Sequence, residues 1–168
     1  MAITSKKVAA IKLKVKKVLK KKKTKKKGRK TRYITGIHIS PKCEKPIHYR
    51  SGWELTVCQT ILDQDPEVLC YSYESVGIPY RSPNLKSTKM RRYFPDFLVS
   101  YKNGTRLIVE VKRNDKIKNI LTQTKAEACI KWAEKQGIKY QIWGSVEIKA
   151  EQVRLTKQSL TTKVTPGK

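Results

Sequence analysis

The sequence predicts an α/β fold in which helices flank a mixed β-sheet, and three observations support this prediction. Residues 97–111 read as a β-hairpin, because apolar residues alternate on both sides of an Asn103-Gly104 turn. Two stretches with helical spacing of apolar residues, 53–62 and 120–136, lie outside this hairpin. Strand patterns occur at 68–74 and at 139–143. The order helix, strand, hairpin, helix, strand predicts an antiparallel three-stranded meander, then a crossover helix and a fourth strand.

The first helix begins with a capping signal. Ser51 is a suitable N-cap, and Glu54 follows three residues later as the partner of a capping box. Glu54 also shares a stripe with the apolar residues Cys58 and Ile61. Two interpretations of Glu54 therefore stay open, a capping residue and a third acidic group directed at the site described below.

The segments around the hairpin carry weaker signals. We expect an irregular connector at 33–50, an edge segment followed by a polar loop at 77–90, and a polar loop at 114–118. Gly137 is a natural residue to follow the second helix. The inward face of that helix is expected to consist of Ala126, Cys129, Ile130 and Ala133. A short helix at 145–155 and a frayed end complete the chain.

The hairpin carries a set of groups suited to chemistry. Since side chains alternate along a strand, Glu110 and Lys112 project from the same face, opposite to Val109 and Val111. Pro95 has no N–H group, so the strand ladder is expected to break there and to direct Asp96 toward Glu110. Carboxylate oxygens bind Mg²⁺, and a lysine stabilises developing charge on a phosphate. The arrangement predicts metal-assisted phosphodiester hydrolysis; the alternative is a surface hairpin with an ordinary charge pattern.

Composition indicates a basic protein that contacts polyanions. The 168 residues include 39 Lys and Arg against 13 Asp and Glu, a net charge of +26. Sixteen of the basic residues and no acidic residue lie before Tyr33, and the remainder is still basic by ten charges. Such a field favours nucleic acid or anionic lipid. We expect residues 1–32 to be a lysine-rich flexible arm, 33–155 the folded domain, and 156–168 a basic C-terminal tail.

The lysine-rich arm has more than one interpretation. It is expected to bind nucleic acid, but a solubilising or targeting segment has the same composition. A weak amphipathic pattern at Val8, Ile11, Val15 and Val18 also allows docking on a protein. The basic residues proposed to contact nucleic acid in the arm are Lys20, Lys21, Lys22, Lys23, Lys25, Lys26 and Lys27.

The cysteines and apolar runs restrict the class further. None of the four cysteines forms a C-x-x-C pair, so we expect reduced and mostly buried thiols. His38, Cys43 and His48 match no standard zinc spacing, and a loop is the better interpretation. No apolar run approaches the roughly 20 residues that span a membrane, and no signal peptide is recognisable.

Several short motifs together resemble a known nuclease superfamily. The pattern P-D at Pro95-Asp96 followed by E-x-K at Glu110–Lys112 resembles the PD-(D/E)xK nucleases, whose restriction-endonuclease-like core has the order αβββαβ. The runs that strengthen the resemblance are Y-R-S-G-W-E at 49–54, D-P-E-V at 65–68, I-P-Y at 78–80, R-R-Y-F-P-D-F-L-V at 91–99 and V-E-V-K at 109–112. They are similar to head-completion nucleases of tailed phages and to the endonuclease subunit of heteromeric transposases. The segment G-I-H-I-S-P-K at 36–42 favours the phage relatives.

The resemblance implies roles for individual residues. Glu54, Asp96 and Glu110 would surround a Mg²⁺ ion, which Mn²⁺ could replace, and Lys112 would be the catalytic lysine. Lys125 on the second helix would be an auxiliary phosphate contact. We also expect Arg91, Arg92 and Arg113, which flank the motif, to contact nucleic acid.

The resulting prediction is a Mg²⁺-dependent DNA endonuclease, with phage head completion or DNA-end processing as the leading role. Its partners would be DNA together with phage head or portal proteins or a transposase partner, and no membrane. Its location would be the virion or the host cytoplasm. The alternatives are a transposon-type or restriction-type endonuclease subunit, and a structural DNA-binding virion protein without turnover.

Overall fold

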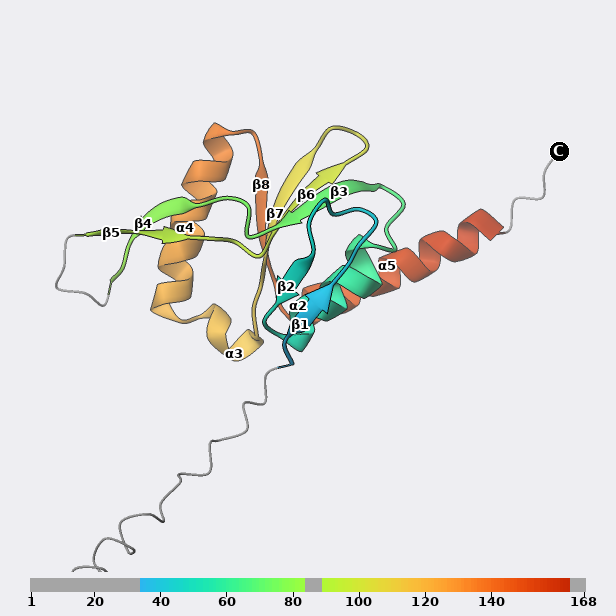
Figure 1. The fold of residues 1–168 in the computed structure, drawn as a ribbon, viewed down its shortest axis with the longest axis horizontal. Coiled ribbons are helices and arrows are strands. Elements are labelled where there is room, and N and C mark those ends of the chain that lie inside the picture. Colours follow the sequence, from blue (N-terminus) through green and yellow to red (C-terminus); the bar gives the residue numbers. More distant parts are fainter. Residues whose placement is uncertain (1–33, 84–88, 164–168) are drawn as a thin grey trace, which may run out of the picture. The chain divides into compact units, whose positions relative to one another are not determined.

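A four-stranded mixed β-sheet forms the centre of the computed structural model, which describes residues 34–83 and 89–163 (Figure 1). The sheet has the order β3-β6-β7-β8. Its strands are β3 (Val68–Tyr73), β6 (Phe97–Tyr101), β7 (Arg106–Val111) and β8 (Lys139–Trp143). The first three pair antiparallel, and β8 lies parallel to β7. The predicted meander, crossover and α/β fold class are confirmed.

The hairpin forms as the sequence predicts. Phe97 lies opposite Val109, and Leu98 lies opposite Ile108. At the turn, Gly104 has a φ of +82°, in the left-handed region that suits glycine. The side chain of Asn103 accepts a 3.0 Å hydrogen bond from the Thr105 N–H and so closes the turn. The alternation therefore directs one set of side chains of β7 to each face of the sheet.

One face of the sheet packs against the first and last helices. These are α2 (Gly52–Val57), which continues as the π-helical turn η1 (Cys58–Leu62), and α5 (Ser145–Lys163). Phe97, Val99 and Val109 of the sheet are fully buried in this core, together with Ile47 and Leu62. Figure 1 shows α2 and α5 on the same side of the strands. Packing in this layer holds α2 in place, and the first turn of α2 contains Glu54.

The opposite face is covered by α4 (Ile120–Lys135) and by a second hairpin that the sequence analysis missed. This hairpin consists of β4 (Ile78–Arg81) and β5 (Met90–Tyr93), within residues 77–90 that were expected to be an edge segment and a loop. Ile78, Tyr80 and Tyr93 are buried beside Ile108 of β7. Both strands are only four residues long. Buried and exposed residues alternate along β4, but β5 begins with three exposed residues and shows no period of two.

Other expectations for the helices need correction. Ile130 is 42% exposed, because the buried stripe of α4 consists of Ala126, Cys129 and Ala133. Residues 114–118, expected to be a loop, contain the short helix α3 (Asn114–Ile117). The terminal helix continues to Lys163 and does not fray after Leu155, since neither glycine nor proline interrupts that stretch. Gly137, with a φ of +64°, ends α4 as predicted.

The expected connector at 33–50 contains the short paired strands β1 (Gly36–His38) and β2 (Ile47–Tyr49). A buried polar network holds this segment to the end of η1. The carboxylate of Asp63 lies 2.8 Å from Nε2 of His38 and accepts hydrogen bonds from Ser40 (2.5 Å) and Tyr71 (2.8 Å). The 36–42 motif thus has a structural use in this chain.

The cysteines of the described residues are all free, as expected, although Cys70 is exposed. Burial raises the pKa of the Cys58 and Cys129 thiols to about 12, so both stay protonated. No helix within the described ranges is long and apolar enough to span a bilayer. The expectations for residues 1–32, including the arm lysines, lie outside the described residues.

Candidate active site

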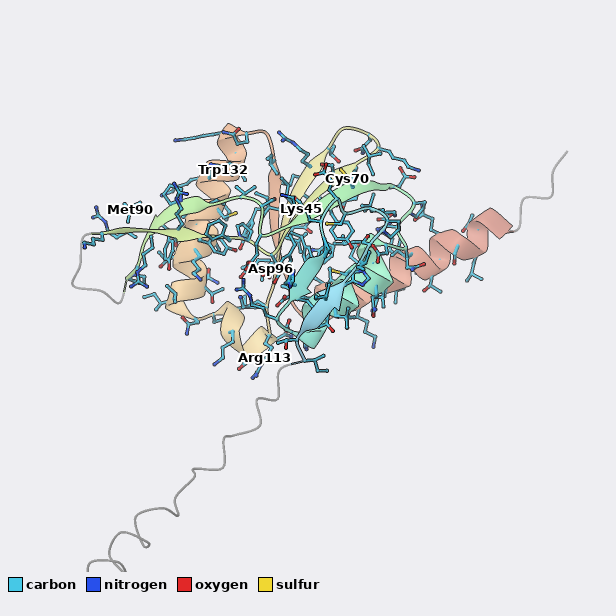
Figure 2. All side chains as sticks on the ribbon, viewed as in Figure 1. Lys45, Cys70, Met90, Asp96, Arg113 and Trp132 are labelled. Carbon is cyan, nitrogen blue, oxygen red and sulfur yellow. The ribbon has the colours of Figure 1, made fainter. Side chains whose placement is uncertain are left out.

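Asp96 and Glu110 lie at the end of the sheet where β6 begins and β7 ends. The β6–β7 ladder ends at the pair Phe97 and Val109, and Asp96 and Glu110 are the next residues along the two chains. Oδ2 of Asp96 accepts a 2.7 Å hydrogen bond from the Val111 N–H, and the Asp96 carbonyl accepts one of 3.0 Å from the Glu74 N–H. The predicted break at Pro95 thus brings Asp96 to the end of the Glu110 strand. Figure 2 shows Asp96 near the middle of the folded unit, between the two helical layers.

Asp96 lies in an electrostatically unfavourable position. Burial raises the pKa of its carboxyl group well above the ordinary value, and the negative charges of Glu110 and Glu54 raise it further. Lys112 and the bond from Val111 oppose the shift. Among the described residues, Oδ1 of Asp96 accepts no hydrogen bond. A cation beside this carboxylate would relieve the repulsion.

Glu110 is buried, with 4% of its surface exposed, and each of its oxygens has a partner. Oε1 lies 2.7 Å from Nζ of Lys112, and Oε2 accepts a 2.6 Å hydrogen bond from the hydroxyl of Tyr93. Burial disfavours the charged ammonium of Lys112, but Glu110, Asp96 and Glu54 together raise its pKa above the ordinary value. Lys112 is therefore charged and forms an ion pair with Glu110.

Glu54 acts as the capping residue that the sequence indicates. Oγ of Ser51 accepts a bond from the Glu54 N–H and donates one of 2.7 Å to Oε1. Oε2 accepts bonds from the Arg50 N–H (2.9 Å) and from the hydroxyl of Tyr73 (2.7 Å). The carboxylate is nevertheless close enough to raise the pKa of Asp96. The capping interpretation is confirmed, and the role as a metal ligand stays a prediction.

Lys125 lies beside this cluster. Its Nζ is 5.2 Å from the ring centroid of Tyr93 and 5.8 Å from that of Tyr80, distances at which an ammonium is attracted to an aromatic face. A cavity of about 250 Å³ opens here. It is lined by Tyr93, Glu110, Lys112, Lys116, Asn119, Leu121, Thr122, Lys125 and Tyr140. Three lysines thus surround a space next to Glu110, and this charge suits a phosphate group.

The remaining predicted contacts within the described residues form no ion pair with Asp96, Glu110 or Glu54. Arg91 and Arg92 are exposed on β5. Arg113 is exposed and pairs with Asp115 at 2.8 Å. Their role in nucleic-acid binding stays a prediction, as does that of the arm lysines.

The tyrosines that hold the carboxylates were not predicted from the sequence. Tyr73 binds Glu54, and Tyr93 binds Glu110. Tyr140 of β8 lines the same cavity. Tyr93 lies three residues before Asp96 in the R-R-Y-F-P-D run, and Tyr73 alternates with Tyr71 along β3. These positions were visible, but only the three-dimensional pairing shows which carboxylate each hydroxyl reaches.

The residues of this cluster meet some, but not all, of the requirements of a divalent-cation site. No three His, Cys, Asp or Glu side chains of the described residues converge as a metal-binding group. Asp96 and Glu110 nonetheless supply the hard oxygen atoms that Mg²⁺ prefers, and burial, followed by the charges of Glu110 and Glu54, raises the pKa of Asp96 and so disfavours its negative charge in the absence of a cation. Asp96 and Glu110 are therefore the residues that would hold the ion.

The comparison with known families agrees with this geometry. Residues 65–144 match the family model described as "TnsA-like endonuclease N terminal". This segment is therefore similar to TnsA-like endonuclease domains. It contains Asp96, Glu110, Lys112 and Lys125 but not Glu54, and it agrees with the PD-(D/E)xK resemblance and supports a nuclease function. No curated protein matches the chain.

Proposed function

We propose that the chain is a metal-dependent DNA endonuclease of the transposon type, with Asp96, Glu110 and Lys112 as its catalytic residues. The observation that carries the proposal is the meeting of Asp96 with the Glu110–Lys112 pair at one end of the sheet, within the TnsA-like endonuclease domain. The match supports DNA as the substrate and a transposase as the partner.

Each residue has a distinct part in phosphodiester hydrolysis. A divalent ion held by Asp96 and Glu110 would polarise the phosphoryl group and supply a nucleophile at neutral pH. The ammonium of Lys112 would stabilise the negative charge that develops on the phosphate as the P–O bond to the leaving sugar oxygen breaks. Tyr93 would keep Glu110 in place through its hydrogen bond. Lys125 would attract a phosphate of the bound strand.

The phage head-completion role has weaker support than the transposon-type role. The 36–42 segment that favours it lies outside the matched residues, and in this chain its side chains bind Asp63. A phage or restriction-type role therefore stays a second prediction. A purely structural DNA-binding role would leave the paired Glu110 and Lys112 unexplained.

Cleavage of supercoiled plasmid tests the proposal. The purified chain should nick or linearise plasmid with Mg²⁺ or Mn²⁺ and should be inactive with EDTA. Asp96→Ala and Glu110→Ala should abolish cleavage yet bind DNA at least as tightly, since each removes negative charge. Glu134→Ala is the charge-matched control, because Glu134 is exposed on α4. Mg²⁺-dependent cleavage by purified Asp96→Ala at the wild-type rate would overturn the catalytic assignment.

A further inference from the structure

A second cavity adjoins the candidate active site, between the β4–β5 hairpin and α4. Its volume is about 390 Å³. It is lined by Ile78, Pro79, Tyr80, Arg81, Met90, Thr124, Glu127, Ala128, Lys131, Trp132 and Lys135. We call it the hairpin groove. Figure 2 shows Met90 and Trp132 on the side of the molecule formed by the hairpin and α4.

The groove combines an apolar floor with cationic sides. Met90 is 56% exposed, and Trp132 is only partly buried where it packs against the core that contains Ile108. Arg81, Lys131 and Lys135 are exposed and form no ion pair with another described residue. The single acidic side chain among the lining residues is Glu127. The groove therefore has an excess of positive charge around an aromatic and thioether surface.

A pair of packed aromatic rings separates the groove from the site cavity, and each cavity is lined by one of the two rings. Tyr80 lines the groove and packs edge-to-face on Tyr93, with ring centroids 6.5 Å apart. Lys125 stands over both rings, and Tyr93 binds Glu110. A strand whose phosphate lies at Lys112 and Lys125 would reach the groove by passing these two rings.

We infer that the hairpin groove binds unpaired nucleotides of the DNA strand that leaves the active site, with a base stacked on Trp132 and phosphates on Arg81, Lys131 and Lys135. Cations alone would suit any nucleic-acid backbone. The partly exposed ring of Trp132 and the exposed side chain of Met90 favour unpaired bases, because only those offer an apolar face for stacking. This inference rests on the proposed function, since it takes DNA as the substrate.

The direct test is to observe Trp132 while an oligonucleotide binds. The full-length chain labelled with 5-fluorotryptophan gives fluorine NMR resonances from Trp53, Trp132 and Trp143. The resonance that disappears in Trp132→Phe is that of Trp132. Titration with oligothymidylate in EDTA avoids cleavage. The Trp132 resonance should move, whereas that of Trp143, which is 3% exposed, should stay. A blunt duplex of equal length should move Trp132 much less. An unmoved Trp132 at saturating oligonucleotide, or an equal shift with the duplex, would overturn the inference.

A matched pair of triple variants tests the charges. Arg81→Ser, Lys131→Ser and Lys135→Ser together should lower the log–log salt slope of oligothymidylate binding by about 2, at about 0.7 for each phosphate contact on a single strand. The control combines Lys102→Ser, Lys149→Ser and Lys157→Ser, which remove the same charge from exposed sites elsewhere. Equal slopes for the two variants would contradict the inference.

The experiments distinguish a failure of this inference from a failure of the proposed function. A Trp132 shift in a chain that cleaves no plasmid would leave the groove as a DNA-binding site and remove the endonuclease. Cleavage that depends on Asp96, with an unmoved Trp132, would remove the groove alone. Binding of a protein segment in place of DNA would also leave Trp132 unmoved by the oligonucleotide and would count against the inference.

Discussion

The hydroxyl of Tyr93 donates a 2.6 Å hydrogen bond to Oε2 of Glu110, and this bond joins the β4–β5 hairpin to the candidate active site. The hairpin lies between β3 and β6 in the chain but outside the four-stranded sheet. Burial, followed by the charge of Glu110, raises the pKa of Tyr93, so the hydroxyl remains a donor. An element added to the core sheet therefore positions one of the two carboxylates that we propose to be catalytic.

We expect Tyr93→Phe to lower the single-turnover cleavage rate about tenfold or more, because a hydrogen bond to a charged group contributes about 1.5–3 kcal/mol. The phenyl ring keeps the packing against Tyr80. Mn²⁺ affinity of the DNA-free protein, measured by calorimetry, should weaken as well, since Glu110 loses one of its two positioning contacts.

Tyr80→Phe is the matched control, because the Tyr80 hydroxyl has no hydrogen-bond partner among the described residues. It should leave both the rate and the Mn²⁺ affinity unchanged. If Tyr93→Phe and Tyr80→Phe behave alike, Tyr93 has only a packing role.

Lys112 offers a second test, which separates chemistry from binding. Lys112→Ala should lower the single-turnover rate by about a hundredfold, the order seen when one donor to a developing oxyanion is lost. DNA affinity should change little, since Lys112 is one of 39 basic residues. Lys118→Ala is the control, because Lys118 is an exposed lysine that follows the E-x-K motif in the sequence. Equal proportional losses of rate and affinity in Lys112→Ala would mean that the lysine only holds phosphate.

The sequence predicted the parts of this fold that depend on periodicity and turn chemistry. The alternation around Asn103-Gly104 placed Glu110 and Lys112 on one face, and the Ser51–Glu54 spacing identified the capping box. The β4–β5 hairpin was missed because Met90, Arg91 and Arg92 are exposed on a four-residue strand and show no alternation. The tyrosine partners of Glu54 and Glu110 were missed because they come from strands that are distant in sequence, and sequence spacing does not encode such pairs.

The Asp63 network predicts a stability effect that leaves the chemistry intact. Asp63→Ala should lower the free energy of unfolding by about 2–3 kcal/mol, because the buried Tyr71 hydroxyl and the Ser40 hydroxyl lose their acceptor. Urea unfolding monitored by circular dichroism measures this change. Glu67→Ala is the control, because Glu67 is exposed and lies, like Asp63, in the segment between η1 and β3. The folded Asp63→Ala protein should retain plasmid cleavage, and a loss of cleavage without a loss of stability would contradict the structural role.

The electrostatics of Asp96 predict that its neutral analogue is more stable than the wild type when no metal is present. Asp96→Asn keeps an acceptor for the Val111 N–H and removes the charge that burial, Glu110 and Glu54 oppose. The wild-type carboxyl has a folded-state pKa above its ordinary value of 3.8, so the folded state binds the proton more tightly than the unfolded state does. The wild type therefore loses stability as the pH rises from 3.8 through the folded-state pKa, whereas Asp96→Asn does not.

Urea unfolding in EDTA at pH 4 and at pH 7.5 should show the advantage of Asp96→Asn, and it should be larger at pH 7.5. Asp115→Asn is a control of opposite sign, because its hydrogen bond to Arg113 lowers the pKa of Asp115. That substitution should give no stabilisation at pH 7.5. Added Mg²⁺ should stabilise the wild type and leave Asp96→Asn nearly unchanged, since the ion compensates the charge that the variant lacks. An Asp96→Asn protein that is less stable than the wild type in EDTA at pH 7.5 would show that the carboxylate is already compensated, and the argument for a cation at this position would then fail.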